Sequence, residues 1–140
     1  MDIVFVDANV LFSAAYRDGA GIARLWDLDD VEVVTSQYAA DEARRNLSDP
    51  QQVIRLDDLL RRTRIPTGGI AYGIPDDIVL PRKDRPILAA AVAVGATHLI
   101  TGDVTHFGAF FGRDVAGIRI VPPARYLLER EERRSSSVSE

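Results

Sequence analysis

Short apolar runs alternate along the chain with segments whose apolar residues recur at helical spacing. Runs rich in Val and Ile lie at residues 3–6, 32–35, 98–101 and 118–121. Continuous runs of this kind are typical of strands buried on both faces of a parallel sheet. Helical patterns occupy residues 8–17, 22–28, 36–47, 50–60, 84–95 and 122–128. Strands that alternate with helices predict an α/β fold in which helices cover both faces of a mainly parallel sheet.

Local signals mark where several of these elements begin and end. Ser36 is the expected N-cap of the helix over 36–47, and Asp84 begins an Ala-rich helix that Gly95 ends. Residues 65–81 contain three Pro and three Gly, so we predict a loop there with at most one short strand. We predict a single domain over residues 1–128, followed by a charged and Ser-rich tail over 129–140 that is frayed or disordered.

The composition excludes several classes of protein. The chain has 140 residues, a net charge of −4 and no Cys, which excludes a disulfide framework and a thiolate metal site. We expect a cytoplasmic protein without a membrane partner, because no apolar run reaches the roughly 18 residues of a membrane span. The net charge does not favour a nucleic-acid binder. Most basic residues are Arg, which binds phosphate well, although a GC-rich genome explains that excess without any ligand.

Two acids directly follow strand candidates. Asp7 comes after the run at 3–6, and Asp103 comes after the run at 98–101. The carboxyl ends of strands in an open α/β sheet form the edge where such folds bind ligands, so both carboxylates would meet there if the strands are neighbours. Glu42 and Asp84 lie on helices, and periodicity alone does not bring them to the same edge. An all-oxygen cluster in a chain without Cys suits Mg²⁺ or Mn²⁺ better than zinc.

Each acid also has a purely structural explanation. Asp7 and Asp84 are good helix N-caps, and Asp103 fits an ordinary turn. Glu42 on a helix is by default a solvated charge. No single acid is therefore a strong signal, and a metal site is predicted only from the four together.

The sequence resembles the PIN-domain family of metal-dependent ribonucleases, in particular its small bacterial toxin-like members. The resemblance rests on four segments in the family's order: VDANVL at 6–11, SQY at 36–38 with Glu42 in the same helix, KDRPILAAA at 83–91 and HLITGD at 98–103. With the strand at 118–121 it spans residues 3 to about 128. It implies a three-layer α/β/α sandwich with about five strands in the order 3-2-1-4-5.

The resemblance also implies a set of site residues. A Mg²⁺ or Mn²⁺ site would be lined by four acids, with two polar residues supporting them through hydrogen bonds. The acids are Asp7, Glu42, Asp84 and Asp103, and the supporting residues are Asn9 and Thr101. Asp7 and Asp103 would ligate metal most directly, and Glu42 would bind a second metal or orient the attacking water. The reaction would be hydrolysis of an RNA phosphodiester.

Further expectations follow from the same resemblance. The chain would be the toxin of a type II toxin–antitoxin pair, with a cognate antitoxin and a homodimeric assembly. Arg44, Arg45 and Arg85 flank the acids and are candidate phosphate contacts. His106 follows Asp103 closely, but metal-assisted hydrolysis needs no histidine, and we expect a structural or loop role for it.

Departures from the pattern leave alternatives open. Residues 65–81 align with no part of the family, and Asp76 and Asp77 compete with Asp84 as the third acid. A phosphatase with Asp7 as nucleophile would need a second acid at the position of Asn9, which cannot act as a general acid. A non-catalytic binding module of the same fold is the other alternative.

Overall fold

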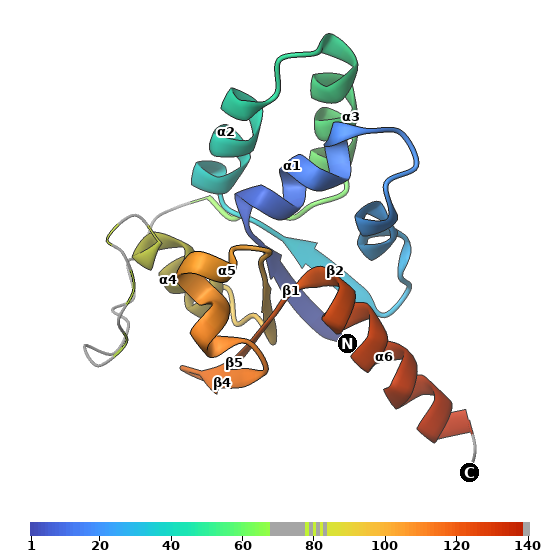
Figure 1. Cartoon of the computed structure of the whole chain (residues 1–140). Helices are drawn as coiled ribbons and strands as arrows, with labels where there is room; N and C mark the ends of the chain where they lie inside the picture. The colour runs from blue at the N-terminus through green and yellow to red at the C-terminus, as the bar shows by residue number, and fades with distance from the viewer. Residues whose placement is uncertain (68–77, 79, 81, 83, 139–140) are drawn as a thin grey trace.

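A computed structural model of the chain describes residues 1–67, 78, 80, 82 and 84–138 (Figure 1). Five strands form one sheet: β1 (Asp2–Val6), β2 (Val31–Val34), β3 (His98–Ile100), β4 (Arg113–Val115) and β5 (Ile118–Val121). The order across the sheet is β2-β1-β3-β5-β4. The first four pair in parallel, and β4 joins the edge antiparallel to β5. The predicted α/β fold with a mainly parallel sheet is confirmed.

The predicted strand order 3-2-1-4-5 is wrong in detail. Beyond β2, where the third strand was expected, the described chain makes only one parallel bridge, from Val34 to Arg64. The backbone N–H of Arg64 donates to the carbonyl of Val33, and its carbonyl accepts from Thr35. At the opposite edge the short strand β4 was not predicted. The central pairing of β1 with β3, which brings their carboxyl ends together, is present.

Six α-helices and two 3-10 segments connect and cover the described strands. Their bounds are α1 (Ala8–Tyr16), η1 (Gly21–Asp27), α2 (Gln37–Asn46), α3 (Pro50–Arg61), α4 (Arg85–Ala93), α5 (Val104–Phe107), η2 (Gly108–Phe110) and α6 (Pro123–Val138). Ser36 caps α2 as predicted, because its hydroxyl accepts from the backbone N–H of Ala39 over 3.1 Å. Among these helices, none is both long and apolar enough to cross a membrane.

Both faces of the central strands are covered. Val4, Phe5 and Val6 are consecutive in β1, and all three are fully buried. Successive side chains of a strand point to opposite faces, so full burial of neighbours requires packing on each side of the sheet. Leu99 and Ile100 of β3 are buried in the same way. The sheet is therefore the middle layer of an α/β/α sandwich, and its core residues form one cluster.

The C-terminal segment predicted to be frayed from Glu129 instead continues α6 to Val138. Arg130 is 3% exposed and donates from Nε to the carboxylate of Asp30 over 3.1 Å. Arg133 and Tyr126 both donate to Oδ2 of Asp2, each over 2.7 Å. These bonds tie the helix to the start of β1 and to the turn before β2.

Candidate metal centre

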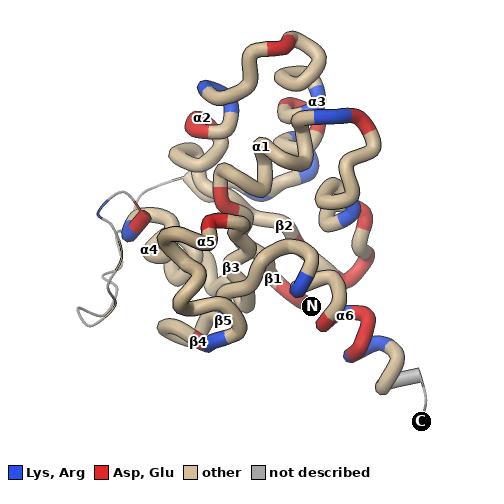
Figure 2. The backbone as a smooth tube through the Cα atoms, viewed as in Figure 1, with Lys and Arg blue, Asp and Glu red and all other residues tan. Residues whose placement is uncertain are grey.

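An open pocket of about 630 Å³ lies where β1 and β3 end. All four predicted acids line it: Asp7, Glu42, Asp84 and Asp103. In Figure 2, acidic segments lie close together where β1 leads into α1 and where β3 leads into α5. The pocket collects residues from four separate parts of the sequence. That these residues bind a metal stays a prediction.

Asp7 is the most buried of the four acids, at 5% exposure. Its Oδ1 accepts from the backbone N–H of Ala8 over 2.7 Å, which caps α1. Its Oδ2 accepts from the hydroxyl of Thr101 over 2.9 Å and from Nδ2 of Asn9 over 3.1 Å. The structural explanation of Asp7 as a helix cap is therefore correct for one oxygen, while the other belongs to the hydrogen-bond network of the pocket.

Asn9 and Thr101 connect the two strand ends. The Nδ2 group of Asn9 donates to the Thr101 hydroxyl over 3.0 Å, and its Oδ1 accepts from the backbone N–H of Gly102 over 2.7 Å. The Thr101 hydroxyl also accepts from the backbone N–H of Asp103 over 3.2 Å. A Cβ at position 102 would lie 3.3 Å from Oδ1 of Asn9, which favours glycine there. This network fixes the relative positions of Asp7 and Asp103.

Ionisation of the Asp7 carboxyl group is less favourable in this pocket than in water. Burial raises the pKa of Asp7 above its usual value, and the negative charges of Glu42 and Asp84 raise it further. The hydrogen bonds from Ala8 and Thr101 oppose this shift without cancelling it. A carboxylate that is costly to ionise among other acids is stabilised by any cation that enters the pocket.

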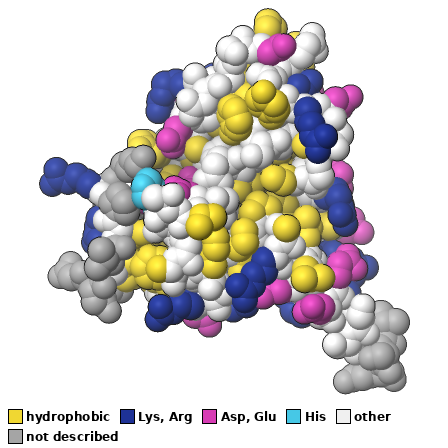
Figure 3. Space-filling view, in the orientation of Figure 1, with side chains coloured by type: hydrophobic (Ala, Val, Ile, Leu, Met, Phe, Trp, Pro, Cys, Tyr) yellow, Lys and Arg dark blue, Asp and Glu magenta, His cyan; other side chains and the backbone are white. Residues whose placement is uncertain are grey.

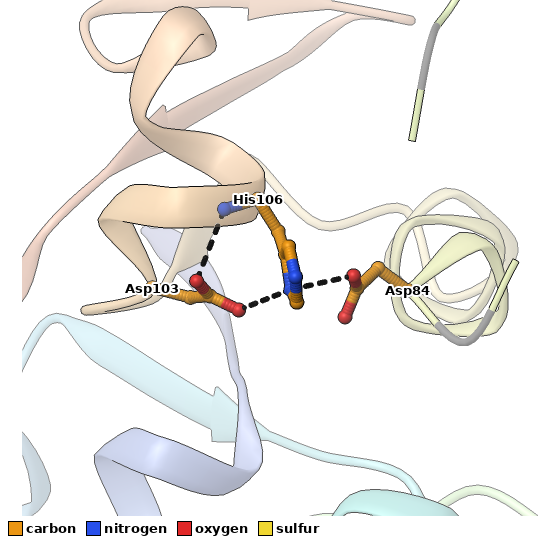
Figure 4. Close-up of side chains that lie close together, drawn as sticks. All are labelled: Asp84, Asp103 and His106. Atoms are coloured by element: carbon orange, nitrogen blue, oxygen red, sulfur yellow. Dashed lines mark hydrogen bonds and ion pairs between the residues drawn. The ribbon is translucent and has the colours of Figure 1, made fainter. Parts of the chain in front are cut away.

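His106 lies between two of the acids (Figure 4). Its Nδ1 is 2.8 Å from Oδ2 of Asp84 and 2.8 Å from Oδ2 of Asp103. Its backbone N–H donates to Oδ1 of Asp103 over 3.1 Å, so Asp103 caps α5. One ligand atom from each of these three residues lies within 4.8 Å of the others, close enough for one ion to contact all three. We expected a structural or loop role for His106; the loop placement is wrong, because the residue lies in α5 beside two pocket acids, and the structural role stays a prediction.

Asp84 does not behave as the helix cap that the sequence also allowed. It occupies the N-cap position of α4, but its side chain makes no capping hydrogen bond and its backbone is helical. The residue is 8% exposed, and its carboxylate faces His106. Asp76 and Asp77, the competing candidates for the third acid, lie outside the described residues.

Glu42 enters the pocket from α2, one turn before Asn46. Asn46 donates from Nδ2 to the backbone carbonyl of Glu42 over 3.1 Å, not to its carboxylate. The Glu42 side chain is partly exposed. Glu42 therefore lines the pocket and is open to solvent.

The three candidate phosphate contacts do not line the pocket. Arg44 pairs with Asp57 of α3, and Arg85 donates from Nη1 to the backbone carbonyl of Ile78 over 3.1 Å. Arg45 is exposed on α2. On the face in Figure 3, most of the visible arginine side chains lie toward the edges of the view. A contact between any of these arginines and a phosphate stays a prediction.

The donor set fits a divalent cation. The pocket presents four carboxylates within a partly buried space; hydrogen bonds hold oxygens of Asp7 and Asp103, and Oδ2 of Asp84 lies 2.8 Å from Nδ1 of His106. Carboxylate oxygens are the preferred ligands of Mg²⁺ and Mn²⁺, and a cation would stabilise the ionised form of Asp7, whose pKa is raised by burial and by the neighbouring acids. The imidazole of His106 adds one nitrogen to this set.

Comparison with known proteins identifies a structural relative but no sequence relative. No protein-family model and no curated protein matches the chain. The fold is similar to one chain of the crystal structure of VapBC2 from Rickettsia felis bound to a DNA fragment from their promoter. The TM-score is 0.54 and the identity 14%, over 86% of this chain and 98% of that chain. At this identity the likeness establishes a shared fold.

Proposed function

We propose that the protein is a metal-dependent endoribonuclease of the PIN-domain type. The observation that carries the proposal is the convergence of Asp7, Glu42, Asp84 and Asp103 on one pocket at the carboxyl edge of the sheet. The fold shared with a chain of VapBC2 supports it. The substrate would be RNA, and the reaction would be hydrolysis of its phosphodiester bonds.

In this proposal the side chains of the pocket have separate tasks. Asp7 and Asp103 would hold Mg²⁺ or Mn²⁺ most directly, Asp84 would complete the site, and Glu42 would bind a second ion or orient the attacking water. When bound, such an ion lowers the pKa of the attacking water and neutralises charge on the phosphodiester. Thr101 and Asn9 keep Asp7 oriented through their hydrogen bonds to its Oδ2.

We further propose that the chain is the toxin of a type II toxin–antitoxin pair, with an antitoxin protein as partner. The support is the VapBC2 structure, which is a complex bound to promoter DNA. A homodimer and a cytoplasmic location belong to the same proposal. Induced expression in a bacterial host should arrest growth for the wild type and not for Asp7→Asn. Normal growth with both proteins would contradict the toxin role.

The direct test is RNA cleavage by the purified full chain. Metal-stripped protein should cut a mixed-sequence RNA after addition of MnCl₂ or MgCl₂ and not in excess EDTA. Asp7→Asn should lower the cleavage rate by at least about 100-fold, because it removes one ligand charge at the centre of the pocket.

Asp29→Asn is the matched control, since Asp29 is exposed in the turn before β2 and outside the pocket. It should cleave at the wild-type rate. Equal cleavage by Asp7→Asn and Asp29→Asn would assign the activity to a contaminating nuclease. Metal binding at the pocket without cleavage of any RNA would favour a non-catalytic binding module.

A further inference from the structure

The arrangement of His106 with two acids has the geometry of a ligand set. Its Nδ1 is 2.8 Å from an oxygen of Asp84 and 2.8 Å from an oxygen of Asp103. Adjacent donor atoms around an octahedral ion with bonds of about 2.1 Å lie about 3.0 Å apart. A shift of a few tenths of an ångström, with release to solvent of the proton that Nδ1 shares with the two carboxylates, would therefore turn these contacts into two edges of a coordination sphere.

The three side chains are partly exposed, while Nδ1 of His106 and Oδ2 of Asp84 are themselves buried. Each is between 11% and 26% exposed, and the two acids line the open pocket. The bond from the backbone N–H of His106 to Oδ1 of Asp103 holds one oxygen of that carboxylate and leaves Oδ2 directed at the ring. Asp84 and Asp103 therefore connect the buried ring nitrogen of His106 with the pocket.

We propose that Asp84, Asp103 and His106 form a transition-metal site in which Nδ1 of His106 is a direct ligand. Imidazole binds Mn²⁺ and the later first-row ions, whereas Mg²⁺ and Ca²⁺ prefer oxygen ligands alone. The pocket therefore selects Mn²⁺ over Mg²⁺. This inference rests on the proposed function, because it names the cofactor of the same pocket, but its test measures bound metal and needs no RNA.

The test compares metal binding by the metal-stripped full chain and two histidine variants. Wild-type protein should bind MnCl₂ more tightly than MgCl₂ by calorimetry. Pulsed electron paramagnetic resonance of the Mn²⁺ complex should detect hyperfine coupling to a nitrogen nucleus. His106→Gln should lose that coupling and weaken Mn²⁺ binding by at least about tenfold, with a much smaller effect on Mg²⁺.

His98→Gln is the matched control. His98, the other histidine of the chain, begins β3 at the end opposite the pocket and stacks edge-on against Tyr126. This variant should keep both the nitrogen coupling and the wild-type Mn²⁺ affinity. Circular dichroism would verify that both variants are folded.

The outcomes separate this inference from the proposed function. Bound Mn²⁺ without nitrogen coupling, or equal Mn²⁺ affinity in wild type and His106→Gln, would overturn the inference and leave His106 as a residue that only positions the two acids. RNA cleavage could still be observed in that case. Nitrogen-coordinated Mn²⁺ in a protein that cuts no RNA would support the inference and overturn the proposed function.

Discussion

The hydroxyl of Thr101 donates a 2.9 Å hydrogen bond to Oδ2 of Asp7. The two residues follow β3 and β1, which are parallel neighbours, so the bond joins the carboxyl ends of the two central strands. The same hydroxyl accepts from Asn9 and from the backbone N–H of Asp103. The buried side chain of Thr101 thus fixes both Asp7 and the turn that carries Asp103.

Replacing Thr101 with valine should destabilise the protein, although valine keeps the shape of the side chain. Thr101 is fully buried, and loss of its hydroxyl removes one of the two hydrogen bonds to Oδ2 of Asp7 and the acceptor of the Asp103 backbone N–H. We expect the free energy of unfolding to fall by about 1–3 kcal/mol, measured by urea denaturation in EDTA. Thr105→Val, at an exposed position of α5, should change it by less than about 0.5 kcal/mol. Similar effects in both variants would contradict this role.

The stability of the metal-free protein should depend on pH through Asp7. The raised pKa means that the folded state keeps its proton at pH values where the unfolded chain, with a pKa near 3.8, has lost it. The contribution of Asp7 to stability therefore falls as pH rises from about 4 through the folded pKa. Relative to wild type, Asp7→Asn should become progressively more stable over that window, as measured by thermal denaturation in EDTA. A stability difference that is constant with pH would contradict this assignment.

Saturating MnCl₂ should reverse this pH dependence, so that wild type gains stability relative to Asp7→Asn as pH rises, because a bound cation stabilises the ionised wild-type carboxylate.

Asp2 should contribute a pH dependence of stability with the opposite sign to that of Asp7. Burial raises its pKa, but the bonds from Arg133 and Tyr126 outweigh burial and leave the pKa below its usual value. Its contribution to stability is present above about pH 4 and is lost as pH falls through the folded pKa. Asp2→Asn should cost about 1–3 kcal/mol at pH 7, measured by urea denaturation. That cost should shrink in acid, and a cost that stays constant down to pH of about 2 would refute the ion pair as its source.

Removing residues 129–140 tests whether the domain ends at residue 128. The deletion removes Arg130, which is buried against Asp30, and Arg133, which binds Asp2. We expect the free energy of unfolding to fall, because Asp2 and Asp30 both lose charged partners. Ser135→Ala, on an exposed part of the same helix, should have little effect. A truncated chain as stable as the full chain would place the domain boundary at residue 128.

Features that depend only on residues close together along the chain were predictable from the sequence. The Ser36 cap follows from its position before a helical pattern, and the buried strands follow from continuous apolar runs. The convergence of Asp7 and Asp103 needed one additional fact, the adjacency of β1 and β3, which the family resemblance implied and the sheet contains.

The strand β4 was missed because its turn lacks the usual sequence signal. Val115 pairs with Ile118 across a two-residue loop, Ala116-Gly117, with φ values of 53° and 82°. Turns with two positive φ angles usually carry Asn or Asp at the first position, and alanine there is rare. Gly117 was the signal available, and it was insufficient by itself.

The position of His106 depends on packing between distant segments. Its spacing of three residues from Asp103 places both at the start of α5. Its approach to Asp84 depends on how α4 lies against the strand that precedes α5, and periodicity does not specify that arrangement. For the same reason the sequence could not decide whether Glu42 faces the pocket.

The bonds between Asp2 and α6 have a practical consequence for experiments on this protein. They hold the start of β1, whereas the pocket lies at the other end of that strand, five residues and roughly 16 Å away. Met1 is 83% exposed at the distal end (Figure 1). An affinity tag or fluorophore attached there would point away from the acids, so immobilised or labelled protein should keep its pocket open to metal and to nucleic acid.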